Sequence, residues 1–182
     1  MAKATEPKTS PIEKRLVVGT SKQGYGVVCT PVEVRKAPKT VVDAQFSIPF
    51  TAATTIVKGT VDLNAFEPEG LTDPVVLDLC SKFNLFVDPE IEEKFHDGCP
   101  PTRLTIHTTR GDFTDVVWHA LGSIENMVSM DDIIEKYYST KRFSANPVKD
   151  GAMEKVVDLA LRMDELDNVN ELLQACYDVF DN

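Results

Sequence analysis

Hydrophobic and polar residues alternate most regularly between residues 103 and 118. The stretch Arg103–Thr108 alternates at every position, and Phe113–Trp118 follows it after the turn residues Arg110-Gly111-Asp112. Strict alternation is typical of a half-buried strand, and a turn that contains glycine lets the chain reverse direction. The pattern therefore predicts a β-hairpin over residues 103–118.

Shorter apolar runs predict further extended segments. Residues 16–18 are expected to form a short strand, followed by a glycine-rich loop over residues 19–26. Residues 27–28 are expected to resume the extended run. Residues 32–34 place valines on either side of a charged residue, as on an edge strand. Residues 85–87 are wholly apolar and are expected to form a buried strand.

The clearest helix signal lies before Gly59, which is expected to cap the C-terminal end of that helix. Asp43 and Ser47 can each accept hydrogen bonds from free backbone N–H groups, and Pro49 suits a first helical turn because it has no N–H to satisfy. Apolar and small residues recur at helical spacing and predict the buried face: Ile48, Ala52, Thr55 and Ile56.

A second helix is expected to begin with Asp73 as its N-cap and Pro74 in its first turn, and to run to about Lys82. Its expected buried stripe consists of Val76, Leu77 and Cys80.

Three further helices are expected in the last third of the chain. Ser129 and Asp132 form a capping-box pattern that starts a helix reaching about Arg142. Apolar periodicity predicts two more helices, over residues 151–163 and 170–179. Mixed strands and helices without strict alternation predict an α+β two-layer domain with a mixed or antiparallel sheet and helices on one face.

Length and charge narrow the function classes. The chain has 182 residues, which suits one domain over residues 12–182 after a polar, flexible tail over residues 1–11. The net charge of −10 argues against a nucleic-acid partner. The sequence shows neither a membrane-spanning apolar run nor the apolar core of a secretory signal, so a cytoplasmic protein is expected.

The residues that carry most chemistry show no catalytic or metal-binding pattern. The four cysteines lack C-x-x-C spacing, and a reduced protein is expected. His107 and His119 flank the predicted hairpin and could face each other, but no third ligand stands nearby. No nucleophile motif or phosphate-binding loop occurs, and Cys29 has no evident histidine partner. No metal and no cofactor are therefore expected.

Cationic side chains are concentrated in the first third of the chain, against the acidic balance of the whole. They are either a solvated surface or a patch that steers an anionic substrate, and the sequence leaves both readings open. The residues are Lys14, Arg15, Lys22, Arg35, Lys36 and Lys39.

The segment Asp43–Ala53 reads DAQFSIPFTAA and resembles the signature of the MmgE/PrpD family, which includes 2-methylcitrate dehydratase, cis-aconitate decarboxylase and iminodisuccinate epimerase. Later segments are also similar: Val57-Lys58-Gly59, Asp73-Pro74, Val87-Asp88-Pro89, and Gly122–Ser129 leading into Asp131-Asp132. The resemblance covers roughly residues 12–166, and only the smaller, C-terminal lid domain of the family. The family's large helical domain is expected to be absent.

The resemblance implies that the signature helix starts at a cleft where a carboxylic acid is bound. The resemblance implies that the substrate-binding residues are Asp43, Gln45, Ser47 and Phe50. It does not identify the catalytic residues. A helix N-terminus suits a carboxylate because free N–H groups and the helix dipole both favour an anion. Phe50 stands where many members of the family have tyrosine, so it offers no hydroxyl for proton transfer.

Two classes of function follow from this resemblance. The first is the lid half of a cofactor-free lyase or isomerase, such as a dehydratase or decarboxylase, docked on a helical partner subunit. The second is a non-catalytic module that binds a small carboxylic acid or a protein; a free-standing lid with its own chemistry is a third possibility. The chain is expected to fold alone and to associate with a partner or with itself through Tyr25, Phe46 and Phe50.

Overall fold

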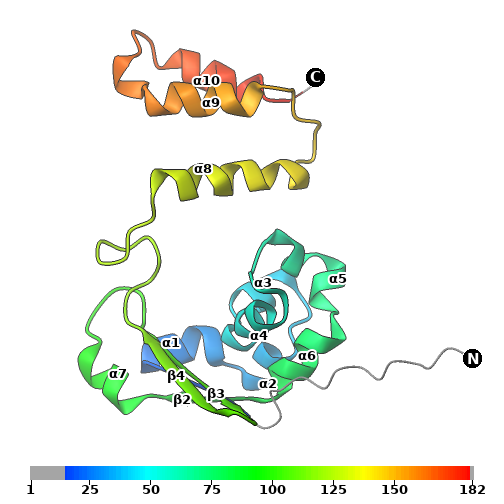
Figure 1. Cartoon of the computed structure of the whole chain (residues 1–182), viewed down its shortest axis with the longest axis vertical. Helices are drawn as coiled ribbons and strands as arrows, with labels where there is room; N and C mark the ends of the chain where they lie inside the picture. The colour runs from blue at the N-terminus through cyan, green and yellow to red at the C-terminus, as the bar shows by residue number, and fades with distance from the viewer. Residues whose placement is uncertain (1–14, 181–182) are drawn as a thin grey trace, which may run out of the picture. The chain divides into compact units, whose positions relative to one another are not determined.

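The computed structural model describes residues 15–180, which fall into two compact units divided after Glu125 (Figure 1). The sequence predicts one domain over residues 12–182, and this division into domains stays a prediction. The tail expected over residues 1–11 lies outside the described residues.

The first unit contains a four-stranded mixed sheet with the strand order β2-β1-β3-β4. β1 pairs parallel with β2 and antiparallel with β3, and β3 pairs antiparallel with β4. The predicted hairpin is confirmed as β3 and β4, and the α+β class with a mixed sheet is confirmed. The strand bounds are β1 Arg15–Thr20, β2 Phe83–Val87, β3 Thr102–Thr108 and β4 Gly111–Val117.

Alternation along the central strands creates the apolar face of this sheet. Leu16 and Val18 are fully buried, and they lie opposite Ile106 and Leu104 in the register of β1 and β3. Side chains two residues apart share one face of a strand, so these four form a continuous apolar surface. β2 confirms the strand predicted over residues 85–87, but its predicted burial is wrong, because Phe86 and Val87 are 38% and 37% exposed.

Short helices make up the rest of the first unit (Figure 1). Their bounds are α1 Lys22–Gly24, η1 Tyr25–Cys29, α2 Val32–Lys36, α3 Val41–Gln45, α4 Ile48–Lys58, η2 Leu63–Phe66, α5 Pro68–Leu71, α6 Pro74–Ser81 and α7 Pro89–Lys94. η1 has the wide π-helical turn, and η2 is a 3₁₀ helix.

Three predictions for the first of these segments are wrong. The glycine-rich loop and the extended run after it are instead α1 and the π-helix η1, and the expected edge strand is the helix α2. The alternation in α2 is misleading because its Arg35 guanidinium and Lys36 ammonium are hydrogen-bonded to carbonyls of other segments. These tertiary contacts outweigh the weak strand preference of the two valines.

α4 and α6 pack together over the apolar face of the sheet. The terminal signals are confirmed: Asp73 accepts N–H bonds at the start of α6, and Gly59 ends α4 with a φ of 85°. The predicted buried face of α4 is wrong in part, because Thr55 is exposed and the buried residues of this helix are Pro49, Phe50, Ala53 and Thr54. α4 contacts both the sheet and α6. It therefore buries residues on more of its circumference than the one apolar stripe that the sequence predicted.

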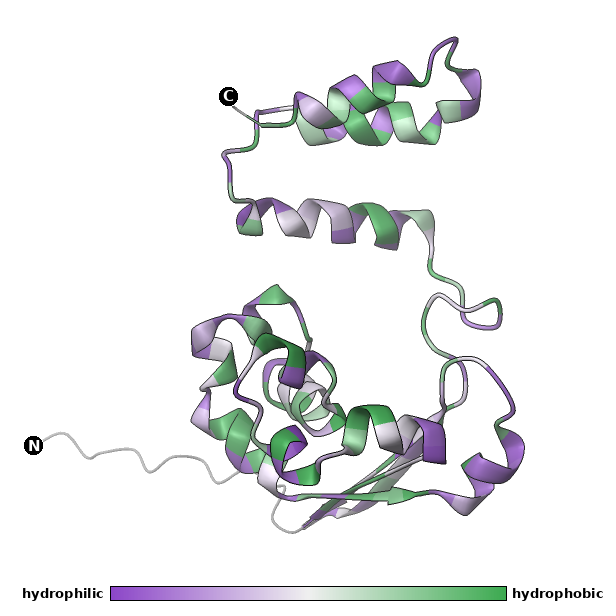
Figure 2. Ribbon diagram, turned by 180° about the vertical axis from the view of Figure 1, so that it is seen from behind, coloured by the Kyte–Doolittle hydropathy of each residue, from purple (hydrophilic) through white to green (hydrophobic). Residues whose placement is uncertain are grey.

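The second unit consists of helices, and each of them carries both polar and apolar residues (Figure 2). The capping box predicted at Ser129 and Asp132 is confirmed, with hydrogen bonds in both directions. The bounds are α8 Met130–Ser139, η3 Thr140–Phe143, α9 Ala152–Leu161, η4 Met163–Glu165 and α10 Asn170–Tyr177.

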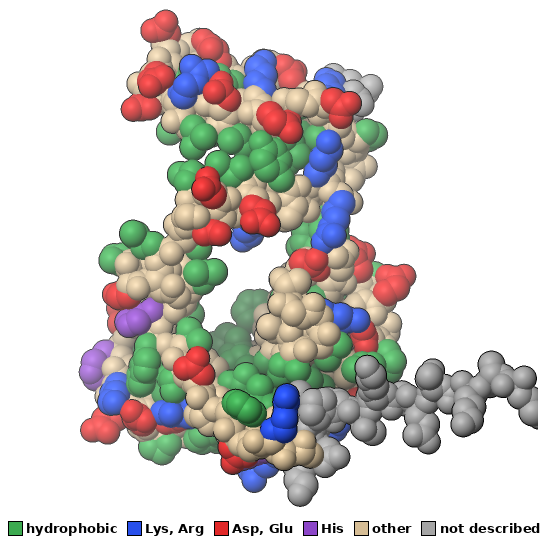
Figure 3. All heavy atoms as spheres, in the orientation of Figure 1, with side chains coloured by type: hydrophobic (Ala, Val, Ile, Leu, Met, Phe, Trp, Pro, Cys, Tyr) green, Lys and Arg blue, Asp and Glu red, His purple; other side chains and the backbone are tan. Residues whose placement is uncertain are grey.

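The apolar sides of these helices meet within the second unit. Hydrophobic side chains gather between α8 and the pair formed by α9 and α10 (Figure 3). Burial raises the pKa of Tyr137 on α8, with smaller contributions from groups that include Cys176 of α10 and Glu154 of α9. Met153 and Ala175 are the most enclosed residues of α9 and α10, respectively.

Among residues 15–180, no helix combines the length and the apolar character that crossing a membrane requires.

Candidate functional site

The signature segment forms the junction between α3 and α4. Ser47 is the N-cap of α4 and accepts the N–H of Phe50 at 3.0 Å, as predicted. Asp43 is not a cap: it lies within α3, whose N-cap is Thr40, and its carboxylate accepts the Thr40 hydroxyl at 2.8 Å. Gln45 is the last residue of α3, so two short helices meet where one helix start was predicted.

Ser47 and Phe50 both point into the protein. The Ser47 hydroxyl also donates to the carbonyl oxygen of Arg35 at 2.5 Å, which ties α2 to the start of α4. The Phe50 ring is 0% exposed, and its centroid lies 6.2 Å from that of Phe66. The ring therefore cannot form part of an association surface, which corrects that prediction for Phe50.

Arg35 holds the segments around the signature together. Its guanidinium donates to the carbonyl oxygens of Thr30 (2.9 Å), Val27 (3.1 Å) and Asp43 (3.4 Å). Three carbonyl bonds from one planar group fix η1, α2 and α3 relative to one another. The guanidinium also brings a permanent positive charge close to the signature. All three of its acceptors are neutral carbonyl oxygens, so none of these bonds neutralises that charge.

The start of α4 offers few free backbone N–H groups that could bind an anion. Pro49 has no N–H, Phe50 donates to the Ser47 hydroxyl, and Thr51 donates to the Ser47 carbonyl at 3.0 Å. Ile48 is then the only one of the first four helical positions whose N–H is left for a ligand. A carboxylate here needs further donors from side chains.

Gln45 is the exposed polar candidate at this junction. Of the four nominated residues, it alone is classed as exposed, whereas Asp43 is half-buried and the other two are buried. Its amide can donate two hydrogen bonds to a carboxylate. Gln45 and the Ile48 N–H are thus the groups of the signature that remain open to a ligand.

No acid–base pair suited to catalysis accompanies Gln45 among the described residues of the signature. Burial raises the pKa of the Cys29 thiol to about 11. The positive charge of Arg35 lowers this pKa, but its effect is the smaller of the two. A thiol with so high a pKa stays protonated at neutral pH and is a poor nucleophile.

The histidines predicted to flank the hairpin each have a carboxylate partner. His107 Nδ1 lies 2.8 Å from Asp112 Oδ1, and His119 Nδ1 lies 3.7 Å from Glu125 Oε2. Within residues 15–180, no group of three or more histidine, cysteine or acidic side chains is arranged to hold a metal ion.

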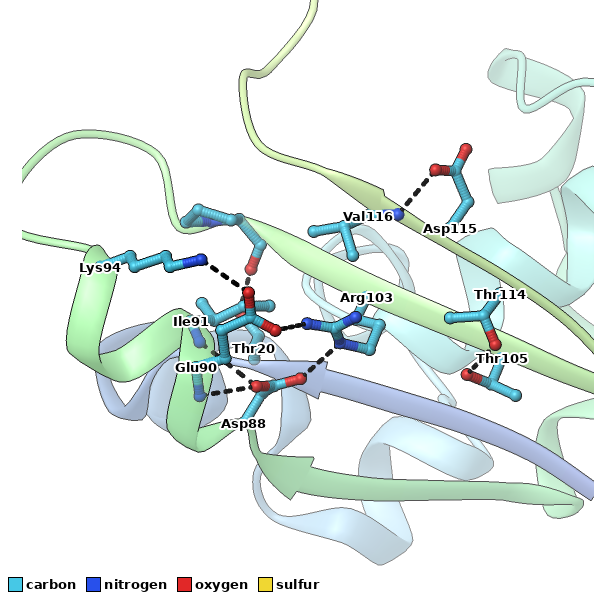
Figure 4. A network of polar contacts seen from close by, with 11 residues as sticks. Thr20, Asp88, Glu90, Ile91, Lys94, Arg103, Thr105, Thr114, Asp115 and Val116 are labelled. Atoms are coloured by element: carbon cyan, nitrogen blue, oxygen red, sulfur yellow. Dashed lines mark hydrogen bonds and ion pairs between the residues drawn. The ribbon is translucent and has the colours of Figure 1, made fainter.

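Sequence analysis missed an ion-pair network at the ends of β1–β3 (Figure 4). Asp88, which is 4% exposed, caps α7 and accepts Arg103 Nε at 2.7 Å, while Arg103 Nη2 reaches Glu90 at 2.6 Å. The sequence D-P-E at residues 88–90 is a local signal for a helix cap. It gives no sign of the ion pair, because Arg103, which binds Asp88, lies 15 residues further along the chain.

Gly19 of β1 packs closely against Phe86 and against Asp88 of this network. A Cβ atom at that position would come within 2.6 Å of the Phe86 ring and 2.9 Å of Asp88 Cβ. Glycine is therefore required for the strand end to approach the cap residue.

The sequence matches the profile of a known protein family. The family profile of the MmgE/PrpD C-terminal domain matches residues 8–162, which is most of the chain and extends to the end of α9. A search among curated proteins finds no match. The chain therefore belongs to the MmgE/PrpD family and carries the C-terminal domain of that family.

Proposed function

We propose that this chain supplies the lid half of the active site in a cofactor-free lyase or isomerase, dehydratase-like or decarboxylase-like, that acts on a carboxylic acid. The observation that carries the proposal is the match to the MmgE/PrpD C-terminal domain over residues 8–162. A helical partner subunit supplies the other half. The reaction takes place in the cytoplasm, where free thiols such as the four in this chain stay reduced.

The chemistry of the reaction indicates which catalytic groups come from this chain and which come from the partner subunit. Removing a proton or a carboxyl group next to a carboxylate requires a base, an acid for the leaving group, and donors that stabilise the charge developing on oxygen. Gln45 and the Ile48 N–H are neutral donors, and the Arg35 guanidinium and the α4 dipole add positive potential. These groups suit a substrate carboxylate, and the base and the acid come from the partner.

The partner docks beside Gln45 in this proposal. Val41, Val42 and Phe46 are 41%, 62% and 47% exposed, respectively, and they belong to α3 or directly follow it. Apolar side chains clustered at a ligand-binding junction are typical of a surface that another protein covers. Closure of that surface would exclude water from the carboxylate.

Gln45 is expected to contribute directly to carboxylate binding. Titration of the chain with citrate is expected to shift the backbone amide resonances of residues 45–48, and Gln45→Ala is expected to weaken binding about 2–10-fold, the effect of one neutral hydrogen bond. Gln45 is exposed, so its replacement is expected to change the free energy of unfolding by less than about 0.5 kcal/mol. Two-dimensional NMR with denaturant unfolding measures both effects.

Gln23→Ala is the matched control, because it removes an exposed amide from α1 instead. It is expected to leave citrate binding unchanged. If citrate shifts resonances only outside residues 45–48, or if both variants bind citrate equally well, the carboxylate site is elsewhere.

A further inference from the structure

A second group of reactive side chains lines a cavity in the first unit, apart from the signature junction. The cavity has a volume of about 450 Å³, and its lining includes His96, Cys99, Trp118, His119 and Glu125. A volume of this size lies in the range of small-molecule sites, which is roughly 300–1,000 Å³. A thiol, two imidazoles and two carboxylates, those of Asp97 and Glu125, thus line one space, although they come from two segments of the chain.

The four cysteines differ sharply in accessibility. Cys29 and Cys80 are fully buried, and burial raises the pKa of their thiols to about 11 and about 12. Cys99 and Cys176 are exposed. Thiolates rather than thiols attack electrophiles, so the two buried residues are inert and the two exposed residues form a natural comparison.

The loop that carries Cys99 is anchored on its C-terminal side. Before Cys99, the Gly98 N–H donates to the carboxylate of its own neighbour Asp97 at 2.7 Å, which shapes the turn locally. After it, Pro100 packs against α1, where a Cβ on Gly24 would come within 2.9 Å of its ring, and the buried Pro101 accepts the Thr20 hydroxyl at 2.8 Å. The anchored residues Pro100 and Pro101 fix the position of the neighbouring Cys99, which lines the cavity.

His119 has the partner expected of a general base. Glu125 lies 3.7 Å from its Nδ1 atom, and the pKa of that carboxyl is lowered first by its own backbone N–H and, to a smaller extent, by the charge of His119. This distance is too long for a hydrogen bond, but a carboxylate so close favours the imidazolium that forms when His119 takes up a proton. His96 lines the same cavity, and within residues 15–180 no carboxylate forms an ion pair with it.

We propose that Cys99 is a nucleophilic thiol that forms mixed disulfides with small disulfide molecules in this cavity, with His119 as its base. His119 takes the thiol proton, and the Cys99 sulfur attacks one sulfur of the disulfide. The Cys99–S–S–R bond forms while the original S–S bond breaks, and the second sulfur leaves as a thiolate. Cys99 is oxidised and the leaving thiol is reduced, so the electrons balance.

Reaction with dithiodipyridine, a neutral disulfide that releases an absorbing product, tests the proposal in the full chain. Cys176→Ser leaves Cys99 as the accessible thiol, and Cys99→Ser leaves Cys176. In folded protein Cys99 is expected to react at least about tenfold faster than Cys176, because general-base assistance adds to simple exposure. In urea the two rates are expected to converge.

Substitution of the histidines then identifies the base. In the Cys176→Ser background, His119→Ala is expected to slow Cys99 to about the rate of Cys176, and added imidazole is expected to restore part of the rate. His96→Ala is the control and is expected to leave the rate within about twofold, because His96 takes no proton in this mechanism. Equal rates for Cys99 and Cys176 in folded protein, or no effect of His119→Ala, would overturn the proposal.

Discussion

Phe50→Ala is expected to lower the free energy of unfolding by about 3–5 kcal/mol, the range for deleting a buried aromatic ring. The ring is 0% exposed, and it belongs to the cluster that joins α4 to β1, β2 and α6. Other members of this cluster belong to β1, β2 and α6, and in a closely packed core they fill only part of the space that the ring leaves. Denaturant unfolding of both proteins measures the loss.

Phe46→Ala is the matched control, since it removes the same ring from the same signature at a position that is 47% exposed. Phe46→Ala is expected to lower the free energy of unfolding by less than about 1 kcal/mol. The ring stays in contact with water in the folded protein, so folding gains little from its burial. Similar losses for the two variants would show that Phe50 is not the centre of this core.

Arg103→Ala is expected to have the second-largest effect, about 2–3 kcal/mol, because it leaves the Asp88 carboxylate without its cation. The Asp88 side chain is 6% exposed and that of Arg103 is 25% exposed. Loss of a partner in a fully buried pair costs roughly 3–5 kcal/mol, and the water contact of Arg103 reduces the expected value.

The effect of Arg103→Ala is expected to depend on pH. Burial opposes ionisation of Asp88, but Arg103 and the N–H groups of Ile91 and Glu90 outweigh it, so the pKa of Asp88 is lowered. A group with a lowered pKa stabilises the folded state above its unfolded-state pKa, about 3.9 for aspartate, and that contribution is lost as the pH falls through the lower, folded-state value.

Unfolding curves at neutral pH and in acid test this dependence. The difference between wild type and Arg103→Ala is expected in full at pH 7 and is expected to shrink once the pH falls below about 3.9. Arg162→Ala is the control, because it breaks an exposed pair with Asp158 on α9. It is expected to cause no measurable loss at either pH, and a pH-independent effect of Arg103→Ala would contradict the account.

The elements that sequence analysis predicted correctly are those with local signals. The alternation of Arg103–Thr108, the Asp73–Pro74 helix start and the capping box at Ser129 each lie within a few residues, and each is confirmed. Such signals work because the hydrogen bonds concerned connect neighbours in the chain. The cap role of Ser47 belongs to the same class.

The elements that were missed depend on distant partners. Val32–Lys36 resembles a strand in sequence, but it is a helix because Arg35 bonds to carbonyls of Val27, Thr30 and Asp43. The ion pair between Asp88 and Arg103 likewise joins residues from separate elements. No periodicity encodes these contacts, since they depend on how the helices pack on the sheet.

The same limit applies to the candidate site. The signature correctly predicted a helix start capped by Ser47, but it could not show that α3 ends just before it, that the Ser47 hydroxyl is used twice or that Phe50 is enclosed. It also gave no sign that Cys99 and His119 line one cavity, because 20 residues and a hairpin separate them in the chain. Gln45 became the main binding candidate only through its exposure.

Reconstitution of an active enzyme is the most direct test of the proposed lid function. The chain is mixed with the helical domain of an MmgE/PrpD enzyme that acts on tricarboxylic acids, produced without its own C-terminal domain, and dehydration or decarboxylation is followed. The account predicts no turnover by either protein alone, turnover by the mixture, and slower turnover with Gln45→Ala. A mixture that associates without turnover would favour a non-catalytic binding module, and turnover by the chain alone would contradict the lid role.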